Sequence, residues 1–300
     1  MTASLGAFLL GAIDYAGLFP PASLELAEAL ANYRVYQRSA DAWALGRFVV
    51  PLARLAELEE LLQRARAGEA GAIAAPRIPL SVLLGSDTAA ELAIVQGFNR
   101  RSLEHGAKVE SVELKAGTAD QARAVLAELP ADWQRYVEIP LGPGAEAVLD
   151  AIHGGCGLAK ARTGGITAEA IPSPEELVGF LALVAARKLP FKATAGLHHP
   201  LRGEYRLTYA EGSPSATLHG YLNLLLAAAI LWKGGGRDRA MEALLETDPG
   251  ALRFDAVSLV WRNLRLDAAA LAGMRRDFFH SFGSCSFREP LDELKAGGWT

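Results

Sequence analysis

The chain has 300 residues, of which 51% are hydrophobic and 21% are charged, so it can bury a large core as one or two domains. Its formal net charge of −4 shows no basic excess and argues against nucleic acid or an anionic membrane surface as a partner. Two cysteines are too few for a disulfide framework, and the apolar run at 222–232 is too short to span a bilayer. We therefore expect a cytoplasmic protein.

Short apolar runs alternate with longer helical patterns along most of the chain. Stretches such as 52–68 and 173–189 have the three- and four-residue apolar spacing of helices, and the second opens with a capping box from Ser173 to Glu176. Eight strands separated by helices predict an α/β fold, a single-domain (β/α)8 TIM barrel over residues 1–300. An open doubly wound sheet is less favoured, since no glycine-rich dinucleotide turn follows the first strand. The candidate strands cover residues 11–17, 46–51, 77–85, 109–117, 135–142, 157–165, 191–197 and 278–286.

One segment interrupts this alternation. Residues 200–276 form a connection far longer than is usual in a barrel. Helical patterns occur within it at 219–233, 238–246 and 267–276. We expect a helical insertion between strands seven and eight, for which the roles of lid, substrate wall and contact in a homo-oligomer all remain open.

Two of the predicted strands contain a lysine inside an apolar run, in LAKARTGG and PFKATAGLHHP. Adjacent strands lie about 4.8 Å apart, so Lys160 and Lys192 could meet if both face the barrel. Repulsion and burial would then lower the pKa of at least one lysine, and a neutral amine can form a Schiff base with a carbonyl compound. The alternative is that each lysine reaches solvent or pairs with a carboxylate such as Glu113 or Glu138.

The motifs, in their order along the chain, resemble those of deoxyribose-phosphate aldolase and related class I aldolase barrels. IDYAGLFPPAS at 13–23, KARTGG at 160–165, FKATAG at 191–196 and FGSCSF at 282–287 are each similar to a strand of that family. The resemblance implies that Lys160 is the Schiff-base lysine and Lys192 the second lysine that perturbs it. It also implies that Glu113, in the run ESVEL, takes the role of a catalytic aspartate.

Several features depart from the pattern of that family and bear on the substrate. Arg162 stands where the family has a small hydroxyl residue, and Glu113 replaces an aspartate. The insertion is longer than the family's connection, and His198 and His199 stand where a plainer loop is expected. The string FKATAGLHHP is also similar to a signature of uncharacterised bacterial proteins.

The first functional hypothesis is a Schiff-base lyase acting on a small carbonyl compound that carries a phosphate or a carboxylate. Lys160, Lys192, Glu113 and His198 are its catalytic residues, and it requires no cofactor and no metal ion. Arg162 and the turn before the last helix would hold the anionic group, because a guanidinium and the N–H groups at a helix start both bind anions. The substrate-binding candidates are Asp14, Glu138, Arg162, His199, Gly283, Ser284 and Ser286.

Two other classes of function remain open. A metal-assisted lyase, isomerase or hydrolase would hold its ion with Asp14, Glu138 and His198. A non-catalytic barrel would bind a metabolite and meet a partner through the insertion. Minor candidates are Cys285 as a nucleophile and Tyr15 or His219 as an acid–base helper, although packing roles are more common for such residues.

Overall fold

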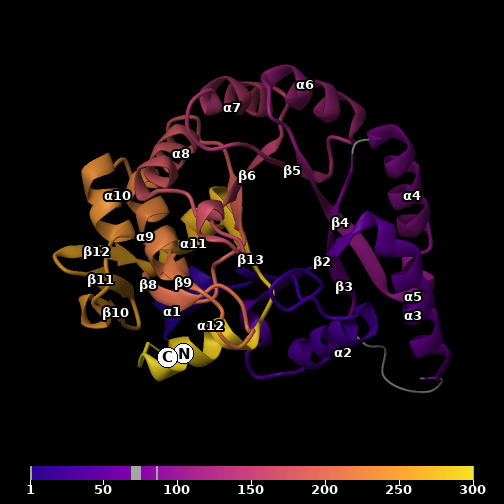
Figure 1. Cartoon of the computed structure of the whole chain (residues 1–300), viewed down its shortest axis with the longest axis horizontal. Helices are drawn as coiled ribbons and strands as arrows, with labels where there is room; N and C mark the ends of the chain where they lie inside the picture. The colour runs from indigo at the N-terminus through magenta and orange to yellow at the C-terminus, as the bar shows by residue number, and fades with distance from the viewer. Residues whose placement is uncertain (1, 69–75, 86, 300) are drawn as a thin grey trace.

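The computed structural model describes residues 2–68, 76–85 and 87–299. Eight parallel strands close into a barrel in the order β1-β13-β7-β6-β5-β4-β3-β2, which confirms the predicted (β/α)8 TIM barrel. Each predicted strand overlaps one strand of this barrel (Figure 1). The barrel strands are β1 (Ile13–Tyr15), β2 (Leu45–Pro51), β3 (Ile78–Leu83), β4 (Ala107–Lys115), β5 (Gln134–Glu138), β6 (Leu158–Arg162), β7 (Phe191–Thr194) and β13 (Phe279–Ser284).

Helices surround the strands and bury their outer faces (Figure 1). The capping box predicted at Ser173 is present, with the Ser173 and Glu176 side chains each bonded to the other residue's backbone N–H. Outside the long insertion, the helices are α1 (Ala3–Leu9), α2 (Leu26–Gln37), α3 (Leu55–Gly68), α4 (Thr88–Arg100), α5 (Ser102–His105), α6 (Ala119–Glu128), α7 (Ala145–Gly154), α8 (Pro174–Ala186) and α12 (Arg288–Ala296), with 3-10 turns η1 (Ala42–Ala44), η2 (Leu52–Arg54) and η3 (Ala168–Ala170).

The long segment between β7 and β13 contains the three predicted helices but is not helical throughout. It also folds a two-stranded antiparallel sheet and a three-stranded antiparallel sheet, which the sequence analysis did not predict. These strands have only three or four residues each, too few for a period-two pattern to stand out. The elements are β8 (Gly203–Arg206), β9 (Ser215–Leu218), α9 (Tyr221–Trp232), α10 (Arg237–Leu244), η4 (Pro249–Ala251), β10 (Leu252–Phe254), β11 (Ser258–Trp261), β12 (Leu264–Asp267) and α11 (Ala268–Asp277).

Helix α9 accounts for the most apolar run of the chain. It packs against α8, α10, α11 and β13, so that Tyr221 to Leu231 are all buried. A helix surrounded by protein on all sides is apolar all round, and α9 is such a core helix. Among the described helices, none combines the length and the apolar character that crossing a membrane requires.

Candidate active site

The two lysines are direct neighbours in the barrel. In the parallel pairing of β6 with β7, Lys160 lies opposite Lys192, and in the pairing of β5 with β6, Glu138 lies opposite Lys160. All three side chains are buried. The two lysines are thus neighbours, as the sequence allowed, but each pairs with carboxylates, and the alternative of a pair with Glu113 or Glu138 is confirmed.

A continuous chain of ion pairs links acids and lysines across the barrel. Lys192 Nζ lies 2.5 Å from Asp14 Oδ2 and 2.7 Å from Glu113 Oε1. Lys160 Nζ lies 2.7 Å from Glu113 Oε2 and 2.8 Å from Glu138 Oε2. Glu113 thus bridges the two ammonium groups with one oxygen each. The arrangement alternates negative and positive charge, which is what burial of five ionised groups requires.

Hydroxyl groups from neighbouring strands hold the carboxylates in place. Ser81 donates to Glu113 Oε1 at 2.6 Å, and Ser111 donates to Ser81 at 2.8 Å. Ser281 donates to Asp14 Oδ2 at 2.7 Å, and the backbone N–H of Arg47 donates to Asp14 Oδ1 at 2.8 Å. These bonds satisfy acceptor sites that would otherwise lose water on burial, and they orient Glu113 towards both lysines.

We expected repulsion and burial to lower the pKa of at least one of the two lysines, and for Lys192 the surrounding charges have the opposite effect. Burial alone would lower the pKa of Lys192, but Asp14 and Glu113 raise it above its usual value. For Glu113, burial would raise the pKa, whereas the ammonium groups of Lys160 and Lys192 lower it well below its usual range. Lys192 therefore stays charged near neutral pH, and it keeps Glu113 ionised.

Small residues follow each lysine because the loops after β6 and β7 touch. An added Cβ on Gly164 would lie 3.0 Å from the Gly196 Cα, and one on Gly196 would lie 3.1 Å from the Gly164 Cα. Thr163 Oγ1 donates to the carbonyl of Ala195 at 2.7 Å and joins the same loops. The small residues after the lysines thus allow the two loops to pack closely together.

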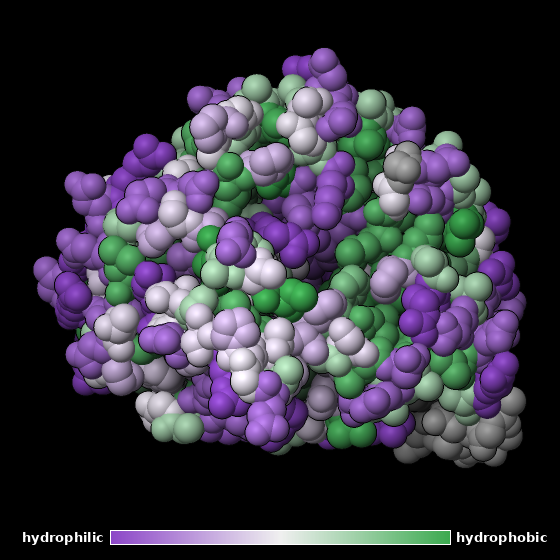
Figure 2. All heavy atoms as spheres, in the orientation of Figure 1, coloured by the Kyte–Doolittle hydropathy of each residue, from purple (hydrophilic) through white to green (hydrophobic). Residues whose placement is uncertain are grey.

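A cavity of about 300 Å³ opens above the lysines at the C-terminal ends of the strands. Figure 2 shows hydrophilic side chains gathered around a hollow near the middle of this face. The volume suits a molecule of a few carbon atoms, at the small end of ligand pockets. The polar and reactive side chains of its lining are Glu113, Lys160, Arg162, Lys192, Thr194, His198 and Cys285.

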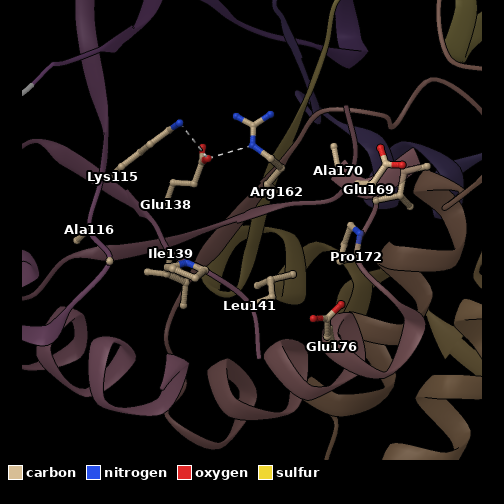
Figure 3. A pocket seen from close by; sticks show the side chains of 13 residues that line it. Lys115, Ala116, Glu138, Ile139, Leu141, Arg162, Glu169, Ala170, Pro172 and Glu176 are labelled. Atoms are coloured by element: carbon tan, nitrogen blue, oxygen red, sulfur yellow. Dashed lines mark hydrogen bonds and ion pairs between the residues drawn. The ribbon is translucent and has the colours of Figure 1, made fainter. Parts of the chain in front are cut away.

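A second, more open cavity of about 560 Å³ adjoins the first at Arg162. Its rim carries Lys115 and Arg162 on either side of Glu138, as Figure 3 shows. Arg162 Nε lies 3.1 Å from Glu138 Oε1, and Lys115 Nζ lies 3.8 Å from the same oxygen. The two Nη atoms of Arg162 point away from Glu138, so this cation can receive an anionic substrate group.

The predicted anion-binding turn uses its hydroxyl groups within the protein. Ser284 is buried and lies 3.3 Å from His198 Nδ1, and Ser286 Oγ accepts the backbone N–H of Glu289 in the first turn of α12. Glu289 also brings a negative charge to this helix start, which weakens its attraction for an anion. Of the three turn residues predicted to bind substrate, only Gly283 lines the cavity. Cys285 of the same turn, which was not among those three, lines it as well.

Other predicted substrate-binding residues have structural roles. Asp14 is fully buried as a counterion of Lys192 and does not line the cavity. His199 is turned away from the lysines, bonded through Nδ1 to Glu293 at 2.8 Å and stacked on Tyr205 with ring centroids 3.5 Å apart. Adjacent residues of an extended segment point in opposite directions, so only His198 of the histidine pair reaches the cavity.

The minor candidates Tyr15 and His219 also have packing roles. Tyr15 is buried and stacks on Phe48 in the barrel core, with ring centroids 5.8 Å apart. His219 is buried, and its Nε2 contacts the carbonyl of Pro172 at 2.8 Å. Neither residue lines the cavity above the lysines, so the packing role is the better interpretation of both Tyr15 and His219.

The metal site expected from Asp14, Glu138 and His198 does not form. Each of these carboxylates is paired with a lysine, and His198 Nδ1 is bonded to Glu289 at 2.9 Å. Across the described ranges, the group of three ligand-type side chains whose atoms lie within 4.8 Å of one another is His199, Glu289 and Glu293. The direct bond between His199 and Glu293 accounts for most of that proximity.

Several residues of the site were missed from the sequence. Ser81, Ser111 and Ser281 each interrupt an apolar strand, and that interruption was a usable signal for inward-facing polar groups. Glu289 gave no such signal, because a glutamate in the first turn of a helix is ordinary helix chemistry. Its role depends on how α12 meets the loop after β7.

Barrels of this architecture commonly form enzymes, with the active site at the end of the barrel where this cavity lies. No protein-family model matches the chain, and no curated protein matches its sequence significantly.

Proposed function

We propose that the protein is a class I aldolase-like lyase that forms a Schiff base between Lys160 and a small carbonyl compound. The single observation that supports this most is the placement of two buried lysines, bridged by Glu113, on the wall of one cavity. Structural ion pairs need no cavity, whereas an amine that lines one can reach a ligand.

Lys160 rather than Lys192 is the nucleophile in this proposal, because the carboxylates around Lys192 keep that lysine charged. Lys192 forms ion pairs with Asp14 and Glu113, and the negative charges of these carboxylates raise the pKa of Lys192. Lys160 shares Glu113 with Lys192 and shares Glu138 with Arg162. Lys192 is thereby held in its charged form, and Lys160 is the amine of this pair that we assign to attack the carbonyl compound.

Glu113 is placed to move the proton of Lys160. Its Oε2 lies 2.7 Å from Lys160 Nζ, and the pKa of Glu113 rises once Lys160 loses its charge, because one of the two cations that lower it is gone. The neutral amine adds to the carbonyl carbon, and the resulting carbinolamine takes the proton back from Glu113 as its oxygen leaves as water, which gives an iminium. Glu113 then removes the proton of the β-hydroxyl group, the second fragment leaves as a carbonyl compound, and the iminium accepts the electron pair of the breaking carbon–carbon bond, while Lys192 keeps Glu113 in place.

The substrate carries an anionic group in this proposal. Arg162 lies between the two cavities and has its Nη atoms turned away from Glu138. A carboxylate or a phosphate of the substrate would bind there by a bidentate pair of hydrogen bonds, with Lys115 beside it.

The test is reductive trapping with sodium borohydride in the presence of small aldehydes and oxo acids, followed by peptide mass spectrometry. We expect the added mass on Lys160 in the wild type, and its complete loss in Lys160→Met. Lys108→Met is the matched control, since Lys108 is exposed at the start of β4, at the end of the strand opposite the cavity, and should leave trapping on Lys160 unchanged. A label on Lys192 instead, or full turnover by Lys160→Met, would contradict the proposal. Ligand-induced thermal stabilisation without trapping or turnover would favour a metabolite-binding barrel.

A further inference from the structure

A cysteine, a histidine and a glutamate are aligned at the edge of the lysine cavity. Cys285 Sγ lies 3.8 Å from His198 Nε2, within reach of a hydrogen bond to sulfur, and His198 Nδ1 lies 2.9 Å from Glu289 Oε2. The two contacts use opposite nitrogens of the ring. This is the order nucleophile, base and orienting carboxylate that activates cysteine in enzymes.

The three residues come from separate parts of the fold. Cys285 directly follows β13, His198 lies in the loop after β7, and Glu289 belongs to the first turn of α12. Cys285 and His198 both line the cavity that contains Lys160 and Lys192. A cysteine that serves only for packing needs neither a neighbouring base nor access to a cavity, whereas Cys285 has His198 as a base and lines the cavity.

We propose that Cys285, His198 and Glu289 form a second nucleophilic centre, which binds an aldehyde covalently in the same cavity as Lys160. The proposal requires the cavity but not an imine on Lys160. The thiol proton passes to His198 Nε2, and the sulfur adds to the carbonyl carbon. The π electron pair moves to the carbonyl oxygen, which takes the proton from His198. One S–C bond forms, no group leaves, and the product is a thiohemiacetal.

The charges around the pair favour this proton transfer. Burial would lower the pKa of His198, but its contacts with Cys285 and Glu289 raise it to about 9. A histidine with that pKa keeps its proton near neutral pH beside the sulfur and can donate it to the carbonyl oxygen of the adduct. The other titratable groups around Cys285 are Tyr209 from the β8–β9 loop, 3.6 Å away, and Tyr15 from β1. Tyr209 also donates to Glu289 Oε2 at 2.9 Å and so fixes the orienting carboxylate.

An aldehyde is the carbonyl class that this centre fits. Its carbon accepts a thiolate without a leaving group, and the cavity of about 300 Å³ admits a molecule of a few carbon atoms. Glu289 contacts only His198 and Tyr209 within this cluster, so it is a positioning residue rather than a catalytic one.

The first test is the rate of iodoacetamide alkylation at each cysteine, followed by mass spectrometry between roughly pH 5.5 and 9.5, a range that includes the usual thiol pKa. The exposed Cys156 is the internal reference thiol. At pH 6 we expect Cys285 to be alkylated several-fold faster than Cys156, because His198 Nε2 lies beside its sulfur and can take the thiol proton. His198→Gln should abolish this advantage, Glu289→Gln should reduce it, and His199→Gln should leave it unchanged as the matched control. Equal pH profiles for both cysteines, or an unreactive Cys285, would overturn the proposal.

The second test uses propanal as the probe in the Lys160→Met variant, which has no nucleophilic amine at that position. We expect propanal to slow the alkylation of Cys285 but not that of Cys156. Borohydride reduces an imine and not a thiohemiacetal, so trapping on Lys160 and protection of Cys285 are separate measurements. If borohydride traps Lys160 in the wild type but propanal does not protect Cys285, the cysteine proposal alone is contradicted. If propanal protects Cys285 but Lys160 is not trapped, only the lyase proposal is contradicted.

Discussion

Glu113→Gln is expected to lower the free energy of unfolding by about 3–5 kcal/mol at pH 7, the usual loss when one partner of a buried ion pair is removed. Glu113 is the only carboxylate among the described residues that bridges both lysines, with bonds of 2.7 Å to each ammonium group. The amide would leave two buried cations with one carboxylate each. Denaturant unfolding followed by circular dichroism measures the loss.

The stability difference between the wild type and Glu113→Gln should depend on pH, and the lowered pKa of Glu113 sets the direction of that dependence. The lysines lower the pKa of Glu113 in the folded protein, so its contribution is fully present above the unfolded pKa of about 4.3. The contribution is lost as the pH falls further towards the folded pKa. The gap between wild type and Glu113→Gln should therefore narrow below about pH 4. Glu110→Gln, on the same strand but partly exposed, is the control and should cost under about 1 kcal/mol. A gap that is constant between pH 7 and pH 3 would contradict the assignment.

Lys192→Met is expected to cost a similar amount, again about 3–5 kcal/mol, because it leaves Asp14 and Glu113 buried with less positive charge. The raised pKa of Lys192 means that its contribution is fully present below the unfolded pKa of about 10.4. It is lost only as the pH rises through the folded pKa, so the whole effect is visible at pH 7. Thermal and denaturant unfolding at that pH measure it.

A second substitution separates charge imbalance from lost packing. Adding Asp14→Asn to Lys192→Met removes the carboxylate that forms an ion pair with Lys192 alone among the described residues, so the double variant should be more stable than the sum of the two single losses predicts. Lys108→Met, an exposed lysine on β4, is the control and should change stability little. Strictly additive losses in the double variant would show that Asp14 and Lys192 are not coupled.

Much of the fold was predictable from the alternation of apolar and helical patterns. All eight barrel strands were predicted, because parallel strands covered on both sides are apolar over several consecutive residues. The pairing of Lys160 with Lys192 followed from their places near the ends of adjacent strands. The short strands of the insertion were missed, since β8 to β12 have no pattern long enough to distinguish them from loops.

The candidate site was predicted in its members more than in its charges. Lys160, Lys192 and Glu113 were expected together, and the structure places them in contact. The sequence analysis stressed repulsion between the two lysines. In the structure, Asp14 and Glu138 complete a chain of alternating charges, so attraction to carboxylates surrounds each lysine. Glu138 had been considered as a lysine partner as well as a substrate contact, whereas Asp14 was assigned to the substrate or a metal ion, since a sequence does not show which strand-end acids turn inward to a lysine.

The order of residues along this chain was enough to specify a barrel with two lysines inside it, because hydrophobic periodicity and strand alternation are local properties. The packing of distant segments set the electrostatics. Glu113 reaches both lysines, and Glu289 reaches His198, only because strands and helices far apart in sequence close on one another. Coulomb energies depend on distances and burial, and neither quantity exists until the barrel has closed.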